Sequence, residues 1–168
     1  VQGTCLSWFK SYLSNCKQKV TIKGISSNAK TLDCGVPQGS VLGPKLFTIY
    51  VMPLEDIIKK HNVQYHVYAD DTSLYLTFKD EDMSCSITKI EALMIDINRW
   101  MTINMLKLNN DKTEIVLFRS KFHNIELQQS ITVGSQCSED STSVRLLGVE
   151  TDCHMSMNTH INSVAKKC

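Results

Sequence analysis

Apolar residues along the chain follow two periods, one typical of helices and one typical of strands. A period of three to four residues predicts helices in residues 4–15, within the loop and helix of residues 36–60, from Asp80 or Asp82 to Met101, and in residues 158–168. Alternation or short apolar runs predict strands in residues 18–23, 30–34, 63–69, 72–78, 113–119, 125–133 and 144–150. Helices on one face of an antiparallel sheet give an α+β fold, which is the class that this order of elements favours.

The predicted helices differ in how clearly they show a core face. In residues 4–15 we expect the inward side chains to be Cys5, Leu6, Phe9 and Leu13. The long central helix carries a stripe that predicts core packing, made of Ile87, Ile90, Met94, Ile97 and Met101. Pro53 predicts a kink within residues 36–60, because proline lacks an amide hydrogen. Residues 24–28 are the expected turn between the first two strands.

Two adjacent aspartates lie where two alternating strand patterns meet, in the sequence Tyr68-Ala69-Asp70-Asp71. The strand faces on either side of the turn are apolar, so both arms can rest on a core while the turn faces solvent. Adjacent carboxylates repel each other, and a hard cation such as Mg²⁺ or Mn²⁺ would relieve that repulsion. The alternative is an ordinary polar turn, since aspartate is common in turns.

A Pro-Gln-Gly loop precedes the helix of residues 36–60. Pro37 fixes a backbone dihedral and Gly39 has no side chain, so the main chain could approach a flat or charged ligand closely. Ser40 is the expected N-cap of the helix, with Pro44 in its first turn. The alternative is a tight loop before a core helix.

These two segments together resemble the reverse transcriptase domain of non-LTR retrotransposons, the long interspersed element type. Further segments resemble that domain in the same order, namely residues 7–14, 106–114 and 146–152, while Cys16 and Ser73 depart from its usual pattern. The resemblance implies a polymerase palm, with a split βαβ arrangement and helices on one face of an antiparallel sheet. It also implies one partial domain over residues 1–168, with the palm over about 1–140 and a primer-grip hairpin and the start of a thumb over about 141–168.

The same resemblance implies an RNA-directed DNA polymerase that transfers nucleotides to a primer 3′-hydroxyl with two metal ions. Its implied partners are an RNA template, a DNA primer and deoxynucleoside triphosphates. Asp70 and Asp71 match the ligands of two Mg²⁺ (or Mn²⁺) ions. Lys112 lies in a stretch that resembles the family's fourth motif and is a candidate to contact the triphosphate or protonate the leaving group, the alternative being a solvated lysine at a strand edge. The remaining implied site residues are Pro37, Gln38, Gly39, Ser40 and Tyr68 for nucleotide and template, and Leu147 and Gly148 for the primer grip.

The family's metal site also needs a third carboxylate, from a strand upstream of the segment that Val1 begins. We therefore expect the isolated chain to be inactive and to require the remaining polymerase segments. An alternative is a noncatalytic remnant of a decayed element, with at most weak nucleic-acid binding. Another alternative is a palm enzyme of a different kind, a viral RNA-copying polymerase or a nucleotide cyclase. Ala69 disfavours the viral polymerases, and the Pro-Gln-Gly loop disfavours both.

Composition and charge bear on the partners and the location expected for this protein. The 168 residues carry a net charge of only +1, which predicts weak affinity for nucleic acid. Seven cysteines without a C-x-x-C pair favour free thiols over a disulfide framework or a zinc site. No apolar stretch approaches the roughly 20 residues of a membrane span. We expect an intracellular protein without a membrane partner, and the resemblance implies a nuclear location for the full-length polymerase.

Overall fold

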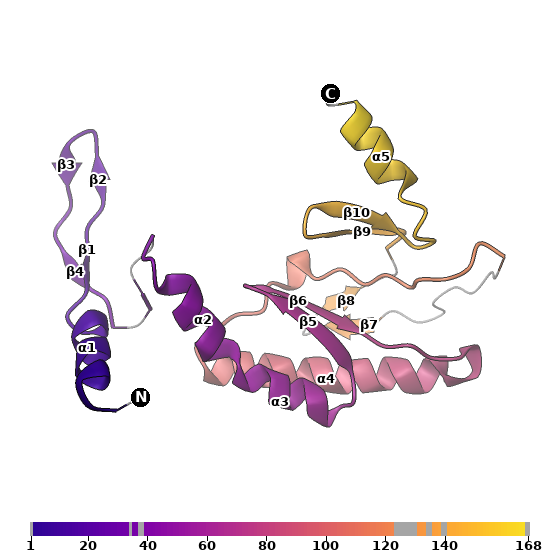
Figure 1. Cartoon of the computed structure of the whole chain (residues 1–168), viewed down its shortest axis with the longest axis horizontal. Coiled ribbons are helices and arrows are strands. Elements are labelled where there is room, and N and C mark those ends of the chain that lie inside the picture. The colour runs from indigo at the N-terminus through magenta and orange to yellow at the C-terminus, as the bar shows by residue number, and fades with distance from the viewer. Residues whose placement is uncertain are drawn as a thin grey trace. The chain divides into compact units, whose positions relative to one another are not determined.

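The computed structural model describes residues 2–33, 35–36, 39–122, 131–133, 136–138 and 141–166. The chain separates into two compact units, Val1–Met52 and Pro53–Cys168, and each is described by itself. Its helices, labelled in Figure 1, are α1 (Gly3–Leu13), α2 (Gly43–Val51), α3 (Pro53–Lys60), α4 (Met83–Ile103) and α5 (Asn158–Ala165), with short 3₁₀ turns η1 (Asp80–Asp82) and η2 (Asn110–Lys112). No helix among the described residues is both long and apolar enough to cross a membrane.

The strands are short and pair only in twos. They are β1 (Lys17–Gln18), β2 (Thr21–Ile22), β3 (Ile25–Ser26), β4 (Lys30–Thr31), β5 (Gln64–Tyr68), β6 (Asp71–Tyr75), β7 (Ile131–Val133), β8 (Gln136–Ser138), β9 (Ser143–Leu146) and β10 (Val149–Asp152). The antiparallel ladders are β1–β4, β2–β3, β5–β6, β7–β8 and β9–β10, and within the described residues they do not join into a larger sheet. Helices mixed with antiparallel strands confirm the α+β class.

Helix α1 forms where the sequence predicts it, but its expected inward face is not buried. Phe9 is half-buried, whereas Cys5, Leu6 and Leu13 are exposed, so that prediction was wrong. The indole of Trp8 stacks on the ring of Tyr12 at 5.2 Å between centroids. A unit of about 50 residues has little interior, which explains why these side chains find no core within it.

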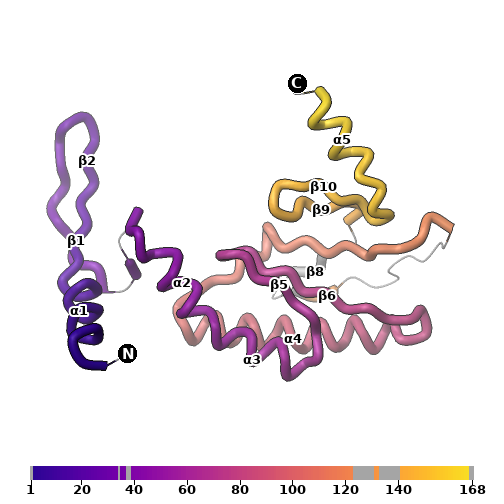
Figure 2. Tube along the Cα trace, in the orientation of Figure 1, coloured from indigo at the N-terminus to yellow at the C-terminus, as the bar shows by residue number. Residues whose placement is uncertain are grey.

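After α1 the chain forms a narrow ribbon of two ladders, seen as a single long loop in Figure 2. Lys17 pairs with Thr31 at its base and Ile22 pairs with Ile25 at its tip. The turn is shorter than the expected residues 24–28, because Lys23 and Gly24 both have positive φ, 49° and 81°, and reverse the chain by themselves.

The helical stretch after the loop divides at the expected proline. Helix α2 ends at Val51 and α3 begins at Pro53, and Pro44 lies in the first turn of α2 as predicted. The assignment of Ser40 as the N-cap was wrong, because Leu42 occupies that position. The Ser40 side chain instead accepts a hydrogen bond from the Leu42 amide at 3.3 Å, within the turn that leads into the helix.

The core of the second unit lies between α3 and α4. It is a cluster of buried side chains, Leu54, Ile58, Val63, Leu93, Met94 and Ile97. The predicted stripe on α4 is confirmed, since Ile87, Met94 and Ile97 are buried and Ile90 and Met101 are half-buried. Asp82 stands at the N-cap of α4, as expected, although its side chain makes no capping hydrogen bond.

The last third of the chain departs most from the predicted strands. Residues 113–119 form no strand, and only Ile115 makes an isolated bridge, its carbonyl accepting from the Ser141 amide at 2.9 Å. In the predicted strand 125–133, residues 125–130 lie outside the described residues and β7 covers the rest. Residues 144–150 are not one strand, because Leu147 and Gly148 have φ of 47° and 87° and form a turn between β9 and β10.

Asp152 organises the connection from β10 to α5. Its carboxylate accepts hydrogen bonds from the amides of His154, Ser156 and Met157 at 2.9, 3.1 and 3.0 Å, and from the Ser156 hydroxyl at 2.7 Å. The bond from that hydroxyl, with the backbone amides, lowers the pKa of Asp152 from 3.8 to about 2. The connection is therefore held by a carboxylate that is preferentially charged in the folded state.

Shortening a fully buried core side chain should destabilise the second unit. Leu93 is 0% exposed, so Leu93→Ala removes packed methyl groups and leaves a cavity, which should lower the free energy of unfolding by about 2–5 kcal/mol. The matched control is Ile95→Ala on the same helix, where the side chain is 68% exposed and the expected change is below about 0.5 kcal/mol. Urea denaturation followed by circular dichroism measures both, and equal losses would contradict the assigned core.

Removing the Asp152 carboxylate should destabilise the chain in a pH-dependent way. The folded pKa lies below the ordinary value, so the unfolded state binds more protons between about pH 4 and pH 2, and the carboxylate's contribution is lost as pH falls through that interval. Asp152→Ala should therefore be less stable than the natural chain above about pH 4, with the difference shrinking toward pH 2. Urea midpoints between pH 2 and 6 measure this, and Ser156→Ala should remove part of the same pH dependence. A difference that does not vary with pH would refute the assignment.

Candidate active site

The paired aspartates lie at the tip of the β5–β6 hairpin, as the sequence predicts. Tyr68 pairs with Asp71 in the ladder, so Ala69 and Asp70 form a two-residue turn. Ala69 has a φ of 56°, in the left-handed region where a β-carbon is disfavoured. The backbone is therefore strained at Ala69, the residue directly before the candidate metal ligands. Strained backbone conformations often occur at functional sites.

Both carboxylates are open to solvent. Asp70 and Asp71 are exposed, and among the described residues neither side chain has a hydrogen-bond or ion-pair partner. Tyr68 is also exposed, with 62% of its surface accessible. Two unneutralised carboxylates on consecutive residues are suited to a hard cation, which takes oxygen ligands and keeps further positions for water and phosphate.

The two carboxylates at the hairpin tip can supply only part of the coordination shell of a divalent ion. Among the described residues, no group of three or more His, Cys, Asp or Glu side chains gathers in one place. Mg²⁺ is commonly held by one or two carboxylates, with water and substrate phosphates completing its coordination. Asp70 and Asp71 meet that requirement for one ion.

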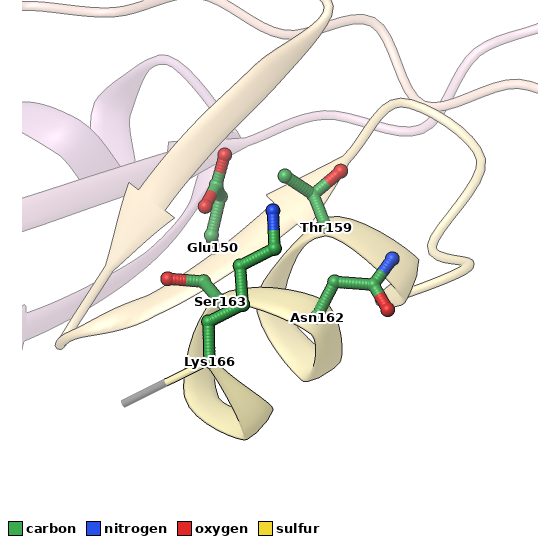
Figure 3. Close-up of a pocket in the computed structure, with 5 residues that line it drawn as sticks. All are labelled: Glu150, Thr159, Asn162, Ser163 and Lys166. Atoms are coloured by element: carbon green, nitrogen blue, oxygen red, sulfur yellow. The ribbon is translucent and has the colours of Figure 1, made fainter. Parts of the chain in front are cut away.

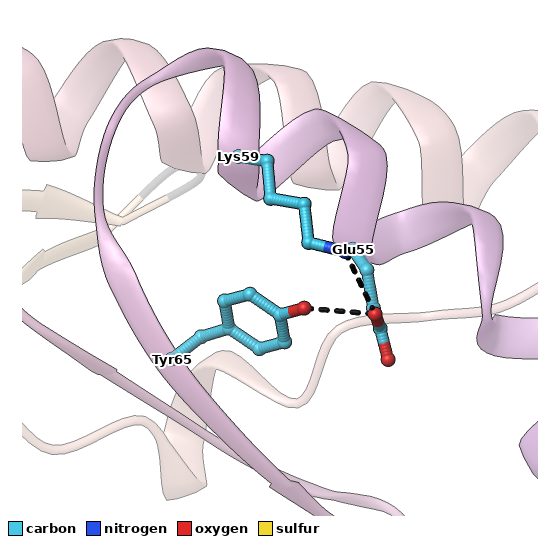
Figure 4. A network of polar contacts seen from close by, with 3 residues as sticks. All are labelled: Glu55, Lys59 and Tyr65. Carbon is cyan, nitrogen blue, oxygen red and sulfur yellow. Dashed lines mark hydrogen bonds and ion pairs between the residues drawn. The ribbon is translucent and has the colours of Figure 1, made fainter.

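A polar contact that the sequence did not reveal fixes the first hairpin strand to α3. The Tyr65 hydroxyl donates to Glu55 Oε2 at 2.8 Å, and Lys59 Nζ lies 3.2 Å from the same oxygen (Figure 4). Hydrogen bonds from Tyr65 and then Lys59 lower the pKa of Glu55. The spacing of four residues between Glu55 and Lys59 is typical of an ion pair on one helix face and is the sequence signal for this part of the network.

Lys112 ends the η2 turn and is exposed. Within the described part of the chain, no hydrogen bond or ion pair joins its side chain to either aspartate. Leu108 and Ile115 on either side of it pack on the same core cluster as Tyr65 and Leu74 of the hairpin. One core therefore supports both the aspartate hairpin and the segment that carries Lys112.

The Pro-Gln-Gly loop belongs to the first unit, whereas the aspartates belong to the second. Pro37 and Gln38 lie outside the described residues. Gly39 has a φ of 79°, in the left-handed region that favours glycine. The Ser40 hydroxyl is hydrogen bonded to the Tyr12 hydroxyl of α1, so the loop is tied to the helix of its own unit.

Leu147 and Gly148 occupy the turn of the β9–β10 hairpin, and Leu147 is 58% exposed. Their role in a primer grip stays a prediction. Beside it, a hollow of about 600 Å³ is lined by Glu150 of β10 and by Thr159, Asn162, Ser163 and Lys166 of the α5 segment (Figure 3). The Glu150 amide donates to His160 Nδ1 at 3.3 Å and so connects the hairpin to α5.

Comparison with known proteins gives consistent matches along the chain. The RNA-directed DNA polymerases from mobile element jockey of Drosophila melanogaster and Drosophila funebris are 24% and 26% identical over 160 and 163 residues. The probable RNA-directed DNA polymerase from transposon BS of Drosophila melanogaster is 23% identical over 164 residues. These matches cover 92%, 92% and 95% of this chain, which spans only 17%, 17% and 18% of the relatives' lengths.

No solved structure gives a significant match. The family model described as reverse transcriptase (RNA-dependent DNA polymerase) matches residues 2–151, a range that includes both the Pro-Gln-Gly loop and the paired aspartates. The resemblance drawn from the motifs is thereby confirmed. Because this match covers most of its length, the chain belongs to the reverse transcriptase (RNA-dependent DNA polymerase) family.

Proposed function

We propose that this chain is the part of a retrotransposon RNA-directed DNA polymerase that binds the catalytic metal ions. The observation that carries the proposal is the pair Asp70 and Asp71, solvent-exposed and without partners among the described residues, on a strained two-residue turn within the family match. Its substrates would be an RNA template, a primer and deoxynucleoside triphosphates.

The proposed roles follow from the chemistry of phosphoryl transfer. Divalent ions, when bound, make the primer 3′-hydroxyl a better nucleophile and neutralise the charge of the departing pyrophosphate. Asp70 is the principal ligand and Asp71 the second. Exposed Tyr68 packs beside the primer end, and Lys112 meets the triphosphate or protonates the leaving group.

The finer fold proposal is a palm of the split βαβ kind. Support comes from the α3–α4 layer beneath the hairpin and from the two-stranded β5–β6 ladder, whose outer edges pair with no other described strand. An additional strand could pair there and bring a further carboxylate next to the two at the tip. The Pro-Gln-Gly loop would contact template and nucleotide, and Leu147 with Gly148 would contact the primer.

A second candidate is a noncatalytic role for the chain on its own. The specific observation in its favour is that the described residues gather only two carboxylates at the tip. A complete two-metal site needs ligands on both ions, so we propose that the 168-residue chain binds a divalent ion weakly and extends a primer only together with the remaining polymerase segments.

Metal binding by the chain can be measured directly. Addition of Mn²⁺ should broaden the amide resonances around Asp70 and Asp71 first, because paramagnetic relaxation falls steeply with distance. Asp70→Asn with Asp71→Asn should weaken this binding by about tenfold or more, since both anionic ligands become neutral. Asp56→Asn, at an exposed position of α3, is the matched control and should leave the titration unchanged. Broadening centred on another part of the chain would refute the metal assignment.

Catalysis requires the whole polymerase. In a full-length polymerase that carries this segment, Asp70→Asn should lower primer extension by at least about 1,000-fold, because the interaction it removes acts on the reacting phosphate. Binding of primer and template should change by less than about threefold, since those contacts lie elsewhere. Gel-resolved extension with Mg²⁺ and a filter-binding assay give the two readouts. Normal extension by this variant would eliminate the proposed role.

A further inference from the structure

The net charge of +1 hides a strong separation of charge between the two units. Residues 1–52 contain six lysines, no arginine and a single acid, Asp33, which gives a net charge of +5. Residues 53–168 therefore carry a net charge of −4. The whole-chain value predicted weak affinity for nucleic acid, but the first unit alone is strongly basic for its size.

Four of those lysines lie on the ribbon of ladders β1–β4 and β2–β3, hereafter the lysine ribbon (residues 17–31). They are Lys17, Lys19, Lys23 and Lys30. All four are exposed, none forms an ion pair with another described residue, and residues 17–31 contain no acid. The ribbon runs six residues from Lys17 to the turn at Lys23, about 20 Å at the rise of a strand.

Two of these lysines share a hollow in the ribbon. Lys19 and Lys30 line a space of about 580 Å³ together with Ser27, Asn28, Thr31 and the carboxylate of Asp33. Residues with hydroxyl and amide side chains therefore line the same hollow as the two lysines, and such groups contact the sugar-phosphate backbone in protein–DNA complexes. With two lysines and one aspartate, the lining residues keep an excess of positive charge.

We propose that the lysine ribbon binds the phosphate backbone of a single nucleic-acid strand, with its four lysines neutralising phosphates on both faces of the ribbon. Lys30 pairs with Gln18 and so lies on the face opposite Lys17, whereas Lys19 and Lys30 line one hollow. Lysine acts as a point charge toward phosphate, and each contact releases a counterion, so binding falls steeply with salt. Such a contact holds the strand and carries no sequence information.

The composition of the ribbon favours nucleic acid over a membrane surface. Membrane-surface segments combine Lys or Arg with Trp, Phe or Leu that enter the lipid, and residues 17–31 contain none of these three. Their exposed large apolar side chains are the aliphatic Val20, Ile22 and Ile25. The ribbon instead carries hydroxyls, and Thr21 and Ser26 are hydrogen bonded across the ladder at 2.8 Å. The choice of nucleic acid also rests on the proposed polymerase function, whereas the ribbon itself needs no metal.

The test is binding of the 168-residue chain to a fluorescein-labelled 20-nucleotide RNA and DNA strand, followed by anisotropy in EDTA between 0.05 and 0.3 M salt. The ribbon variant changes all four lysines to Gln. The control variant changes four exposed lysines of the second unit to Gln, namely Lys60, Lys79, Lys107 and Lys121, so both variants lose the same net charge.

The ribbon variant should lose at least about tenfold in affinity at 0.1 M salt, and its slope of log K against log salt should fall by about 3. The control variant should keep the natural slope. Circular dichroism and the Thr21 and Ser26 amide resonances show that the ribbon remains folded. Equal losses in both variants, no binding to either strand, or binding only to phosphatidylserine vesicles would each overturn the proposal. Because EDTA removes metal, failure here is separable from failure of the aspartate site, which Mn²⁺ titration tests.

Discussion

The buried contact between α3 and α4 is the constraint on which the rest of the second unit depends. Ile58 and Leu93 are fully buried there, and the hairpin side chains Tyr65 and Leu74 rest on the same cluster. Each buried aliphatic side chain contributes roughly 1.5–3 kcal/mol when removed from water. The hairpin tip can tolerate two like charges and a strained turn because its arms are anchored by this cluster and by the Tyr65 hydrogen bond to Glu55.

The two units of the chain carry net charges of opposite sign. The second unit is acidic overall and presents two exposed carboxylates at a hairpin tip, which suits cations. The first unit is basic and presents lysines along a narrow ribbon, which suits polyanions. A polymerase needs both kinds of surface, because its metal ions and its nucleic acid carry opposite charge. A near-neutral total is thus compatible with strong local fields.

Local patterns predicted the parts of the fold that depend on local rules. The stripe from Ile87 to Met101, the break at Pro53 and the hairpin around Asp70 all follow from periodicity or from proline chemistry. The strand pattern alone missed the turn at Leu147 because its residues continue an apolar run, whereas the family resemblance implied a hairpin there. The Glu55 contact was missed because it joins residues ten positions apart. The burial expected for Leu6 and Leu13 failed because an amphipathic pattern identifies a face but not its partner. The charge separation required a unit boundary at residue 52, which no linker marks in the sequence.

The left-handed backbone at Ala69 also limits how this segment can diverge. With a φ of 56°, the position costs an alanine about 1 kcal/mol, favours glycine or asparagine, and strongly disfavours valine, isoleucine or threonine. This restriction acts through the geometry of a two-residue turn and is independent of any metal. Position 69 should therefore remain confined to small or turn-forming residues in any relative that keeps this turn, whatever activity that relative has.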